Sequence, residues 1–373
     1  MPINHGKRRA SNILYEAAKQ TWVNRAGRIG EVSEVFPDFS SFRAIPLRNL
    51  PSDAVMSAEF EGTGSKPEIA ERVGYHGTVA HDLFAMACDD AVRRGGEPAV
   101  IGSVLDVNGF QSSRGSHLGM IMQLAEGTIS AAREARVAVI NGEVADLGPR
   151  VRGVGPFNYN WSAGVIWFAR TSRMLRGNEI KNGDKIVALR EEGFRSNGLT
   201  LLRKTMQNAY GSNWTEQELD GRTIGEQALH PSRIYTKAVV DMVGGVAGEP
   251  MAEVHGISHV TGGGLPEKLR RALMPSGLGA RITDPMVPCG LMIHCQEIGN
   301  ISDREAYMTW NMGQGMCIFT PNPADVERVA GRHNIRSKVI GEVTTEPTIV
   351  IQSRGAFSPQ AWEKLVFPIR EEW

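Results

Sequence analysis

The sequence predicts an α/β protein of two domains, and three observations support this prediction. The chain has 373 residues, which is more than one hydrophobic core usually holds. Apolar runs typical of strands alternate with segments of helical periodicity, and there are no internal repeats. A polar stretch, TSRMLRGNEIKNGD at residues 171–184, interrupts this alternation. We therefore expect an N-terminal domain over residues 1–172 and a C-terminal domain over residues 173–373.

The first half contains the elements expected of a mixed domain. Its clearest helix is residues 77–94, because Val79, Leu83, Phe84 and Ala87 recur at three- and four-residue spacing. The glycines that follow at 95 and 96 suit the end of a helix. The other predicted elements are a short helix over 12–20, a loop and edge strand over 36–50, strands over 55–60, 98–107, 137–140 and 161–170, and a helix over 119–135.

The second half repeats this mixed character. A new strand at residues 185–189 follows the polar stretch, and a strand CIFT at residues 317–320 follows the glycine segment NMGQGM. That segment fits either a tight bulge or the edge of a ligand site. The other predicted elements are helices over 199–208, 234–243 and 323–332, a strand–loop–helix unit over 254–272, strands near Ala280 and over 338–343, and one short strand beyond residue 346.

The composition excludes several classes of function. Lys plus Arg equals Asp plus Glu at 41 each, so nothing indicates a nucleic-acid or anionic-membrane partner. No apolar run approaches the roughly 18 residues of a membrane span, and the basic N-terminus lacks the apolar stretch of a signal peptide. The four cysteines form no CxxC pair, and Cys289, His294 and Cys295 match known zinc spacings poorly. We expect a cytoplasmic protein with reduced thiols.

Acidic residues gather on the helix predicted at residues 77–94. At about 100° per residue, Asp89 lies within about 20° of Asp82, and Asp90 lies about 80° away. Carboxylates in the C-terminal half of a helix oppose its dipole, which is costly unless a cation offsets them. A solvated acidic face is the simpler interpretation of these three residues taken alone.

Two further acids follow predicted strands and favour a metal site. Glu61 precedes a glycine turn, and Glu143 follows the strand at residues 137–140. Ligand residues of α/β proteins gather at strand ends, and Mg²⁺ is often held by one or two carboxylates together with nucleotide phosphates. Carboxylates of this kind, together with those on the helix at residues 77–94, therefore suit the binding of Mg-ATP.

Three glycine-containing turns are candidate phosphate loops. EGTGSK, with Glu61, Gly62, Gly64 and Lys66, lacks the spacing of a P-loop but brings backbone amides and a lysine together. The turn Asn197-Gly198 precedes a helix and is either a simple cap or an anion site at a helix N-terminus. The run Thr261-Gly262-Gly263-Gly264 also opens a helix, and three glycines there suggest close approach by a ligand. Nearby His259 is either a substrate contact or a satisfied loop histidine.

The chain resembles the aminoimidazole ribonucleotide synthetase (phosphoribosylformylglycinamidine cyclo-ligase) family. Segments in the family's order carry the resemblance: HDLFAMACDDAVRRGGEP, VINGEVADLG, NGDKIVALREEGFRSNGLTLLRK, ALHPSRIYTKAV, SHVTGGGLPEKL and TWNMGQGM. The resemblance implies a homodimer in which N-terminal sheets pair into a barrel, each followed by a C-terminal α/β sandwich domain. It also implies ATP-dependent ring closure of formylglycinamidine ribonucleotide to aminoimidazole ribonucleotide, a step of purine biosynthesis.

The resemblance also implies roles for particular residues. Asp90, Glu143, His259 and Lys66 fall at positions expected in catalysis, and Glu61, Asp90 and Glu143 at positions of the metal and phosphate carboxylates. The positions expected to contact the nucleotide are Glu61, Gly62, Gly64, Lys66, Asp82, Asn197, Gly198, Thr261, Gly262, Gly263 and Gly264.

Several positions depart from the family's pattern. Glu61 replaces an aspartate, and Arg195 replaces the histidine before Asn197-Gly198; arginine cannot act as a base near neutral pH but suits clamping a phosphate. The family's N-terminal DAGN-type motif is absent. Two alternatives therefore stay open: a divergent superfamily member using ATP on another amide or phosphate acceptor, and a catalytically silent ATP-binding dimeric paralogue.

Overall fold

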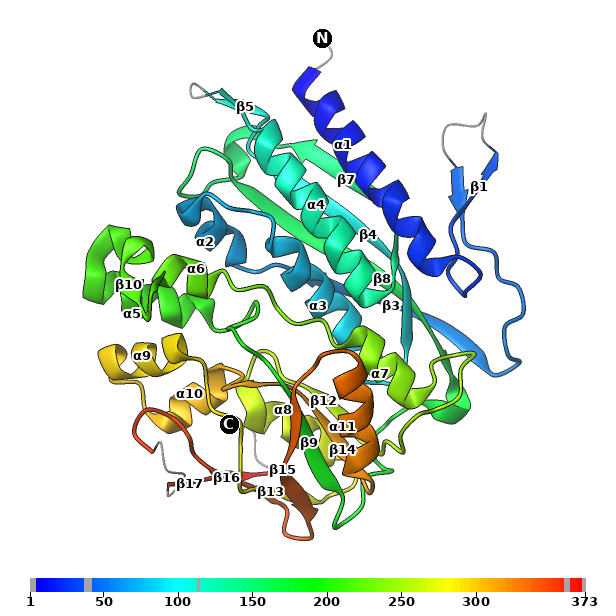
Figure 1. Ribbon diagram of the computed structural model, residues 1–373, viewed down its shortest axis with the longest axis vertical. Helices are drawn as coiled ribbons and strands as arrows, with labels where there is room; N and C mark the ends of the chain where they lie inside the picture. The colour runs from blue at the N-terminus through cyan, green and yellow to red at the C-terminus, as the bar shows by residue number, and fades with distance from the viewer. Residues whose placement is uncertain (1–4, 37–41, 113–114, 359–362, 371–373) are drawn as a thin grey trace.

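The computed structural model describes residues 5–36, 42–112, 115–358 and 363–370 (Figure 1). Within these residues the chain builds two main sheets, the first from residues 54–170 and the second from residues 185–368. The predicted two-part α/β organisation is therefore present, with the change of sheet at the polar stretch that follows residue 170.

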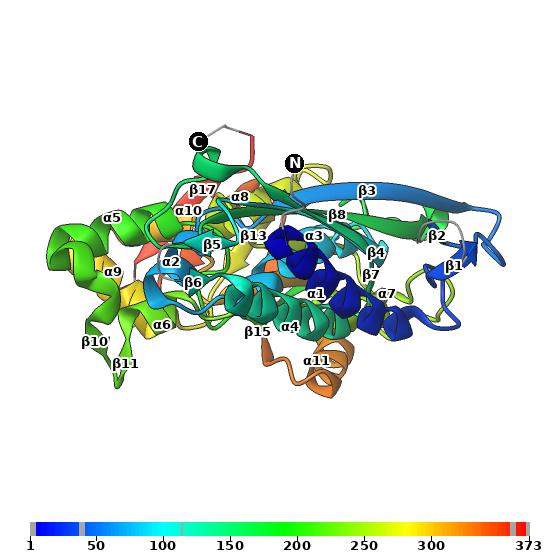
Figure 2. The same cartoon turned by 90° about the horizontal axis from the view of Figure 1, so that it is seen from above.

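The N-terminal sheet has the order β3 (Ala54–Gly62), β8 (Tyr159–Arg170), β4 (Glu97–Val107) and β7 (Ala138–Asp146). Strand β4 runs parallel to β7 and antiparallel to β8. Three helices lie on one face of this sheet: α1 (His5–Thr21), α3 (Val79–Val92) and α4 (Leu118–Ala135) (Figure 2).

The two faces of the N-terminal sheet differ sharply. Alternate residues of β8, such as Trp161, Val165 and Trp167, point into the core beneath the helices. Most of the other face is apolar and exposed, with Phe60 78% exposed and Met56 60% exposed, but one end of it (Val100, Ala138, Phe168) is buried against Val32 and Val246. A depression of about 820 Å³ lies on it. An uncovered apolar face of this size is typical of an interaction surface.

The C-terminal sheet has the order β12-β14-β9-β15-β13-β16-β17. Along β9, Ile186 and Ala188 enter one hydrophobic cluster while Val187 and Leu189 enter another. Helices therefore cover both faces: α7 (Thr236–Val243) and α11 (Pro323–Arg332) on one side, and α8 (Gly264–Leu273) on the other. The strands are β9 (Lys185–Arg190), β12 (Gly256–His259), β13 (Gly279–Ile282), β14 (Gln314–Thr320), β15 (Ser337–Thr344), β16 (Thr348–Gln352) and β17 (Lys364–Pro368).

Most predicted elements are present, and the differences are local. The helix predicted at residues 12–20 is the longer α1, and the strand predicted at 137–140 continues through Glu143 to Asp146. Within the described residues, two short strands and not one follow residue 346. Helices that the sequence analysis missed are α2 (Lys66–Val73), α6 (Ile224–Ala228), α9 (Gly290–Gly299) and α10 (Asp303–Thr309).

The remaining elements are helix α5 (Leu199–Tyr210) and several short strands and 3₁₀ turns. Helix α5 begins at the predicted position. The others are the strands β1 (Ser33–Phe36), β2 (Phe42–Ala44), β5 (Gln111–Ser112), β6 (Gly115–Ser116), β10 (Glu218–Leu219) and β11 (Arg222–Thr223), and the 3₁₀ turns at Trp22–Arg25, Gly148–Arg150, Thr171–Arg173 and Gly211–Glu216. Part of the loop predicted at 36–50 lies outside the described residues. No helix in the described ranges is long and apolar enough to cross a bilayer.

Candidate active site between the two sheets

A polar pocket of about 480 Å³ lies where the two sheets meet. Its N-terminal wall comes from the end of β3 and the end of α3, through Glu61 and Asp90. Its C-terminal wall comes from β12 and the loop into α8, through Ser258, His259 and Thr261. The structure thus brings together site residues that are far apart in the sequence.

Asp90 is the best-placed carboxylate in this pocket. Arg93, one helical turn later, contacts both of its oxygens, with Nε 3.1 Å from Oδ1 and Nη2 3.2 Å from Oδ2. The Nδ1 of His259 lies 3.1 Å from Oδ1. Burial alone would raise the pKa of Asp90, but His259 and Arg93 together hold it well below its usual range. The side chain is 22% exposed and ionised, so it is available to a cation in the pocket.

Glu61 is the second carboxylate of the pocket. Partial burial, the charge of Asp90 and the charge of Glu59 raise its pKa, because each of these disfavours the ionised form. A cation between Glu61 and Asp90 would relieve that repulsion. Two carboxylates with room for phosphate oxygens are a donor set that Mg²⁺ accepts, so these two residues fit the predicted ion.

Glu143 does not join them within one chain, which corrects the prediction of a three-carboxylate site. Glu61 pairs with Ala163, which faces the helix-covered core, whereas Glu143 pairs with Val104, whose side chain is on the open face. β3 and β7 are also the two edges of the sheet, about 14 Å apart at the usual strand spacing. Glu143 is instead exposed beside Lys7 at 3.4 Å. In the described residues no three His, Cys, Asp or Glu side chains gather as a metal site, the Cys289–Cys295 region included.

Lys66 and Asp82 are also placed differently from the prediction. Both side chains are fully buried, with the Lys66 ammonium 3.1 Å from Asp82 Oδ1. Lys66 also donates to the carbonyl of His230 at 2.8 Å, and Asp82 accepts from the Ser232 hydroxyl. They form an internal ion pair of the N-terminal half, which His230 and Ser232 of the C-terminal half contact, and neither side chain lines the pocket. A buried lysine is satisfied here by charge and carbonyl oxygens, so a phosphate is not needed to explain it.

The three glycine-containing turns meet next to the pocket. A Cβ added to Gly64 would lie 3.4 Å from the Ser196 carbonyl, and one added to Gly262 would lie 3.4 Å from Asn197 Oδ1. The turns at residues 62–65, 196–198 and 261–264 therefore form one surface. Sequence periodicity could not show this, because the turns come from different sheets.

Different physical constraints favour glycine at the individual positions of these turns. Gly198, Gly263 and Gly264 have φ values of 73°, 90° and 65°, which other residues rarely adopt. A Cβ on Gly264 would also lie 1.9 Å from the Tyr307 carbonyl oxygen, so this glycine serves backbone packing. Gly262 is exposed without such a neighbour and is the glycine of this run that is open to a ligand.

Sequence analysis missed the basic side chains around the pocket. They are Arg93, Arg94, Arg176, Lys268 and Arg271, against the two carboxylates Glu61 and Asp90. Burial, and then the charge of Arg271, lower the pKa of Lys268 despite the opposing effect of Asp90. The Arg93–Asp90 pair has the i, i+3 spacing that a sequence reveals, but Arg176 and Lys268 had no local signal. An excess of cations makes this pocket suitable for phosphate groups.

Comparisons with known proteins agree with this organisation. Residues 46–162 match the model of the AIR synthase related protein, N-terminal domain, and residues 181–354 match that of its C-terminal domain. The phosphoribosylformylglycinamidine cyclo-ligase of Methanocaldococcus jannaschii is 30% identical over 285 residues, 76% of each chain. That of Thermococcus kodakarensis is 29% identical over 93% of this chain and 95% of its own.

Solved structures share the fold at low sequence identity. Thiamine-monophosphate kinase from Stenotrophomonas maltophilia has a TM-score of 0.59 at 15% identity, covering 88% of this chain and 93% of its own. The hydrogenase maturation protein HypE has a TM-score of 0.57 at 15% identity, covering 88% and 92%. These matches show a shared two-domain α/β architecture and no more. On the family models and the cyclo-ligase relatives together, the chain belongs to the AIR synthase related family.

Proposed function

We propose that this protein is an ATP-dependent cyclo-ligase that converts formylglycinamidine ribonucleotide to aminoimidazole ribonucleotide. The observation that carries the proposal is the pocket between the sheets, where Glu61 and Asp90 lie beside three glycine-containing turns and an excess of cations. Relatives at about 30% identity named phosphoribosylformylglycinamidine cyclo-ligase support the choice of reaction. A HypE structure in complex with ATP supports nucleotide use by a protein of this fold.

In the proposed reaction, the γ-phosphoryl group of ATP passes to the amide oxygen of the substrate and ADP leaves. The amidine nitrogen of the substrate then attacks the carbon of the phosphorylated amide, and the carbon–oxygen bond breaks to release phosphate. Such chemistry depends on positioning and on neutralising phosphate charge. Bound Mg²⁺ would supply charge neutralisation at the phosphates, and Glu61 and Asp90 would hold it.

The other residues have roles that follow from their places. Backbone amides of the turns at 62–65, 196–198 and 261–264 would contact phosphate oxygens, with Gly262 giving the closest access. Lys268 in the middle of α8 and Arg271 in its last turn would bind the phosphate charge from the C-terminal wall. Lys66, Asp82 and His259 have no direct contact with the ligands in this proposal.

The protein would act as a homodimer through the open face of its N-terminal sheet. Phe60 and Met56 on β3 and Val104 on β4 are exposed there without a covering element among the described residues. Burying such side chains in a second copy contributes about 25 cal/mol per Å² of apolar area. Glu143 also lies on this face, so it would belong to the dimer interface and not to the pocket of its own chain.

One assay tests the reaction directly. Purified protein is incubated with ATP, Mg²⁺ and formylglycinamidine ribonucleotide, and both ADP and the aminoimidazole product are measured. Stoichiometric formation of the two supports the proposal. ADP formation with another amide or phosphate acceptor, and none with this substrate, would reject the cyclo-ligase assignment.

A second candidate is a divergent enzyme of the same superfamily that uses ATP on a different acceptor. The observation that favours it is Arg195, whose guanidinium is 1% exposed and bound to Glu191 and Asp89. The residue that replaces the family's histidine therefore does not clamp a substrate phosphate, contrary to our prediction from sequence. Absence of Mg-ATP binding would reject both candidates, whereas Mg-ATP binding without turnover of any acceptor would favour the silent ATP-binding paralogue.

A further inference from the structure

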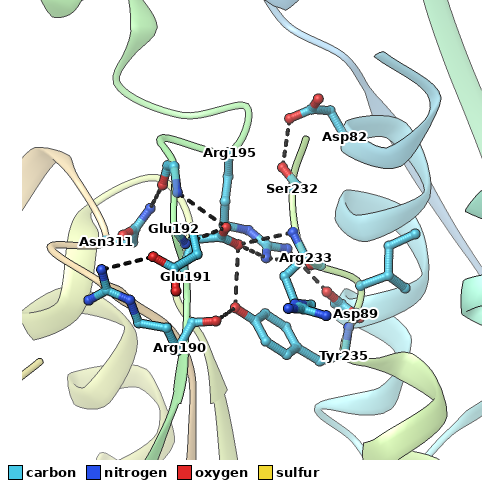
Figure 3. A network of polar contacts seen from close by, with 12 residues as sticks. Asp82, Asp89, Arg190, Glu191, Glu192, Arg195, Ser232, Arg233, Tyr235 and Asn311 are labelled. Carbon is cyan, nitrogen blue, oxygen red and sulfur yellow. Dashed lines mark hydrogen bonds and ion pairs between the residues drawn. The ribbon is translucent and has the colours of Figure 1, made fainter. Parts of the chain in front are cut away.

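Arg195 occupies a buried position at the centre of the junction between the two sheets (Figure 3). Its Nη1 donates to Glu191 Oε2 at 2.8 Å and to the Arg233 carbonyl at 2.9 Å, and its Nη2 donates to Asp89 Oδ2 at 3.1 Å. Its backbone φ is 60°, a conformation that costs about 1 kcal/mol or more for a non-glycine residue. Asp89 is held in turn by the Tyr235 amide and the Thr236 hydroxyl. The guanidinium group is therefore fixed from several sides.

The same Nη2 lies 2.9 Å from Nε2 of His259. An arginine side chain has five N–H donors and no acceptor, so Nε2 must be the acceptor and cannot carry a proton. The single proton of the neutral ring is then on Nδ1. That nitrogen lies 3.1 Å from Asp90 Oδ1 and donates to it.

We propose that Arg195 is a positioning residue for Asp90, acting through His259. It fixes the His259 ring as the Nδ1–H tautomer, whose proton is directed at Asp90 and holds that carboxylate toward the pocket. A ring free to adopt the other tautomer would present a lone pair to Asp90 and repel it. The inference rests on the proposed role of Asp90 in binding Mg-ATP.

This arrangement also removes His259 from the acid–base chemistry expected from sequence. Its side chain is fully buried, and both ring nitrogens are already bonded within the protein. A general acid or base needs a nitrogen within reach of the ligand. A ring whose orientation and tautomer are fixed by a neighbour is instead typical of a residue that orients another.

The tautomer is tested by ¹⁵N NMR of protein labelled at its nine histidines. The His259→Asn variant lacks one pair of ring signals and so assigns them. We expect wild-type His259 to show a protonated Nδ1 and an unprotonated Nε2. Arg195→Gln or Arg195→Met should shift these signals toward a tautomer mixture. An Nε2–H tautomer in the wild type, or identical signals in a folded Arg195 variant, would overturn the inference.

Nucleotide affinity tests the consequence, with calorimetry of Mg²⁺ and a non-hydrolysable ATP analogue. His259→Gln places an acceptor near the Nε2 position but has no donor at Nδ1, whereas His259→Asn keeps a donor toward Asp90. We expect about tenfold weaker binding for His259→Gln and a clearly smaller loss for His259→Asn. Equal losses in the two variants, or none in either, would refute the positioning role.

His255→Gln is the matched control for a buried histidine of the same segment. Its ring is bonded to Asp184 and Glu253 at 2.8 and 2.9 Å and lies outside the pocket lining. We expect unchanged analogue affinity in this variant. Absence of binding by the wild-type protein would reject the proposed function, while the NMR experiment would still decide the tautomer.

Discussion

Replacing Lys66 by methionine tests whether this residue stabilises the fold or binds phosphate. Methionine keeps most of the apolar volume but removes the ammonium group that lies 3.1 Å from Asp82 Oδ1. Both side chains have no exposed surface, so Asp82 would stay buried with Ser232 as its main polar partner. Breaking one side of a buried pair typically costs about 3–5 kcal/mol. We therefore expect the free energy of unfolding to fall by about that amount.

Urea unfolding followed by fluorescence of the seven tryptophans measures this loss. If the free energy of unfolding falls by about 3 kcal/mol per M of urea, the urea concentration at the unfolding midpoint should fall by about 1 M or more. The double variant Lys66→Met/Asp82→Asn should recover at least half of the loss, because the neutral amide no longer needs a counter-ion. If Lys66→Met keeps wild-type stability but binds a nucleotide analogue more than tenfold weaker, the ammonium faces the ligand and our assignment is wrong.

Four further predictions follow from particular contacts. Asp90→Asn should lower the kcat/KM for ATP turnover by about 100-fold with an unchanged circular dichroism spectrum, because the site loses charge for the cation; near-normal rates would contradict this. Gly264→Ala should lower the free energy of unfolding by about 3 kcal/mol or more, because the added Cβ would lie 1.9 Å from the Tyr307 carbonyl oxygen. Gly262→Ala should change the free energy of unfolding by less than about 1 kcal/mol. Equal effects of the two variants in chemical denaturation would refute the packing role of Gly264. Burial lowers the pKa of His76 to about 4, so between about pH 6.5 and 4 the unfolded chain binds a proton that the folded chain does not. The free energy of unfolding should therefore fall by up to about 3 kcal/mol as the pH drops through that window. His76→Gln should remove that part of the pH dependence. Phe60→Glu should weaken self-association in sedimentation experiments, and an unchanged monomer–dimer equilibrium would exclude the open face as the interface.

Local sequence patterns determined most of the secondary structure. The helix at residues 77–94 and the strands at 98–107 and 161–170 were predicted within a few residues, because their periodicity depends only on neighbours in the chain. The missed helices are short. Helix α2 begins at Lys66-Pro67, directly after a glycine turn that we interpreted as loop. Family resemblance added the order of the motifs and the correct family.

The roles of the charged residues were decided only by tertiary structure. Asp82, Asp89 and Asp90 share one helix, yet Asp82 and Asp89 are buried in ion pairs with Lys66 and Arg195, and only Asp90 reaches the pocket. Glu61 and Glu143 both end predicted strands, yet they point to opposite faces of the sheet. For Asp89 and Asp90, the partners Arg195 and His259 lie more than a hundred positions away in the sequence. Sequence spacing carries no information on these two long-range contacts, because packing between the two halves of the chain creates them.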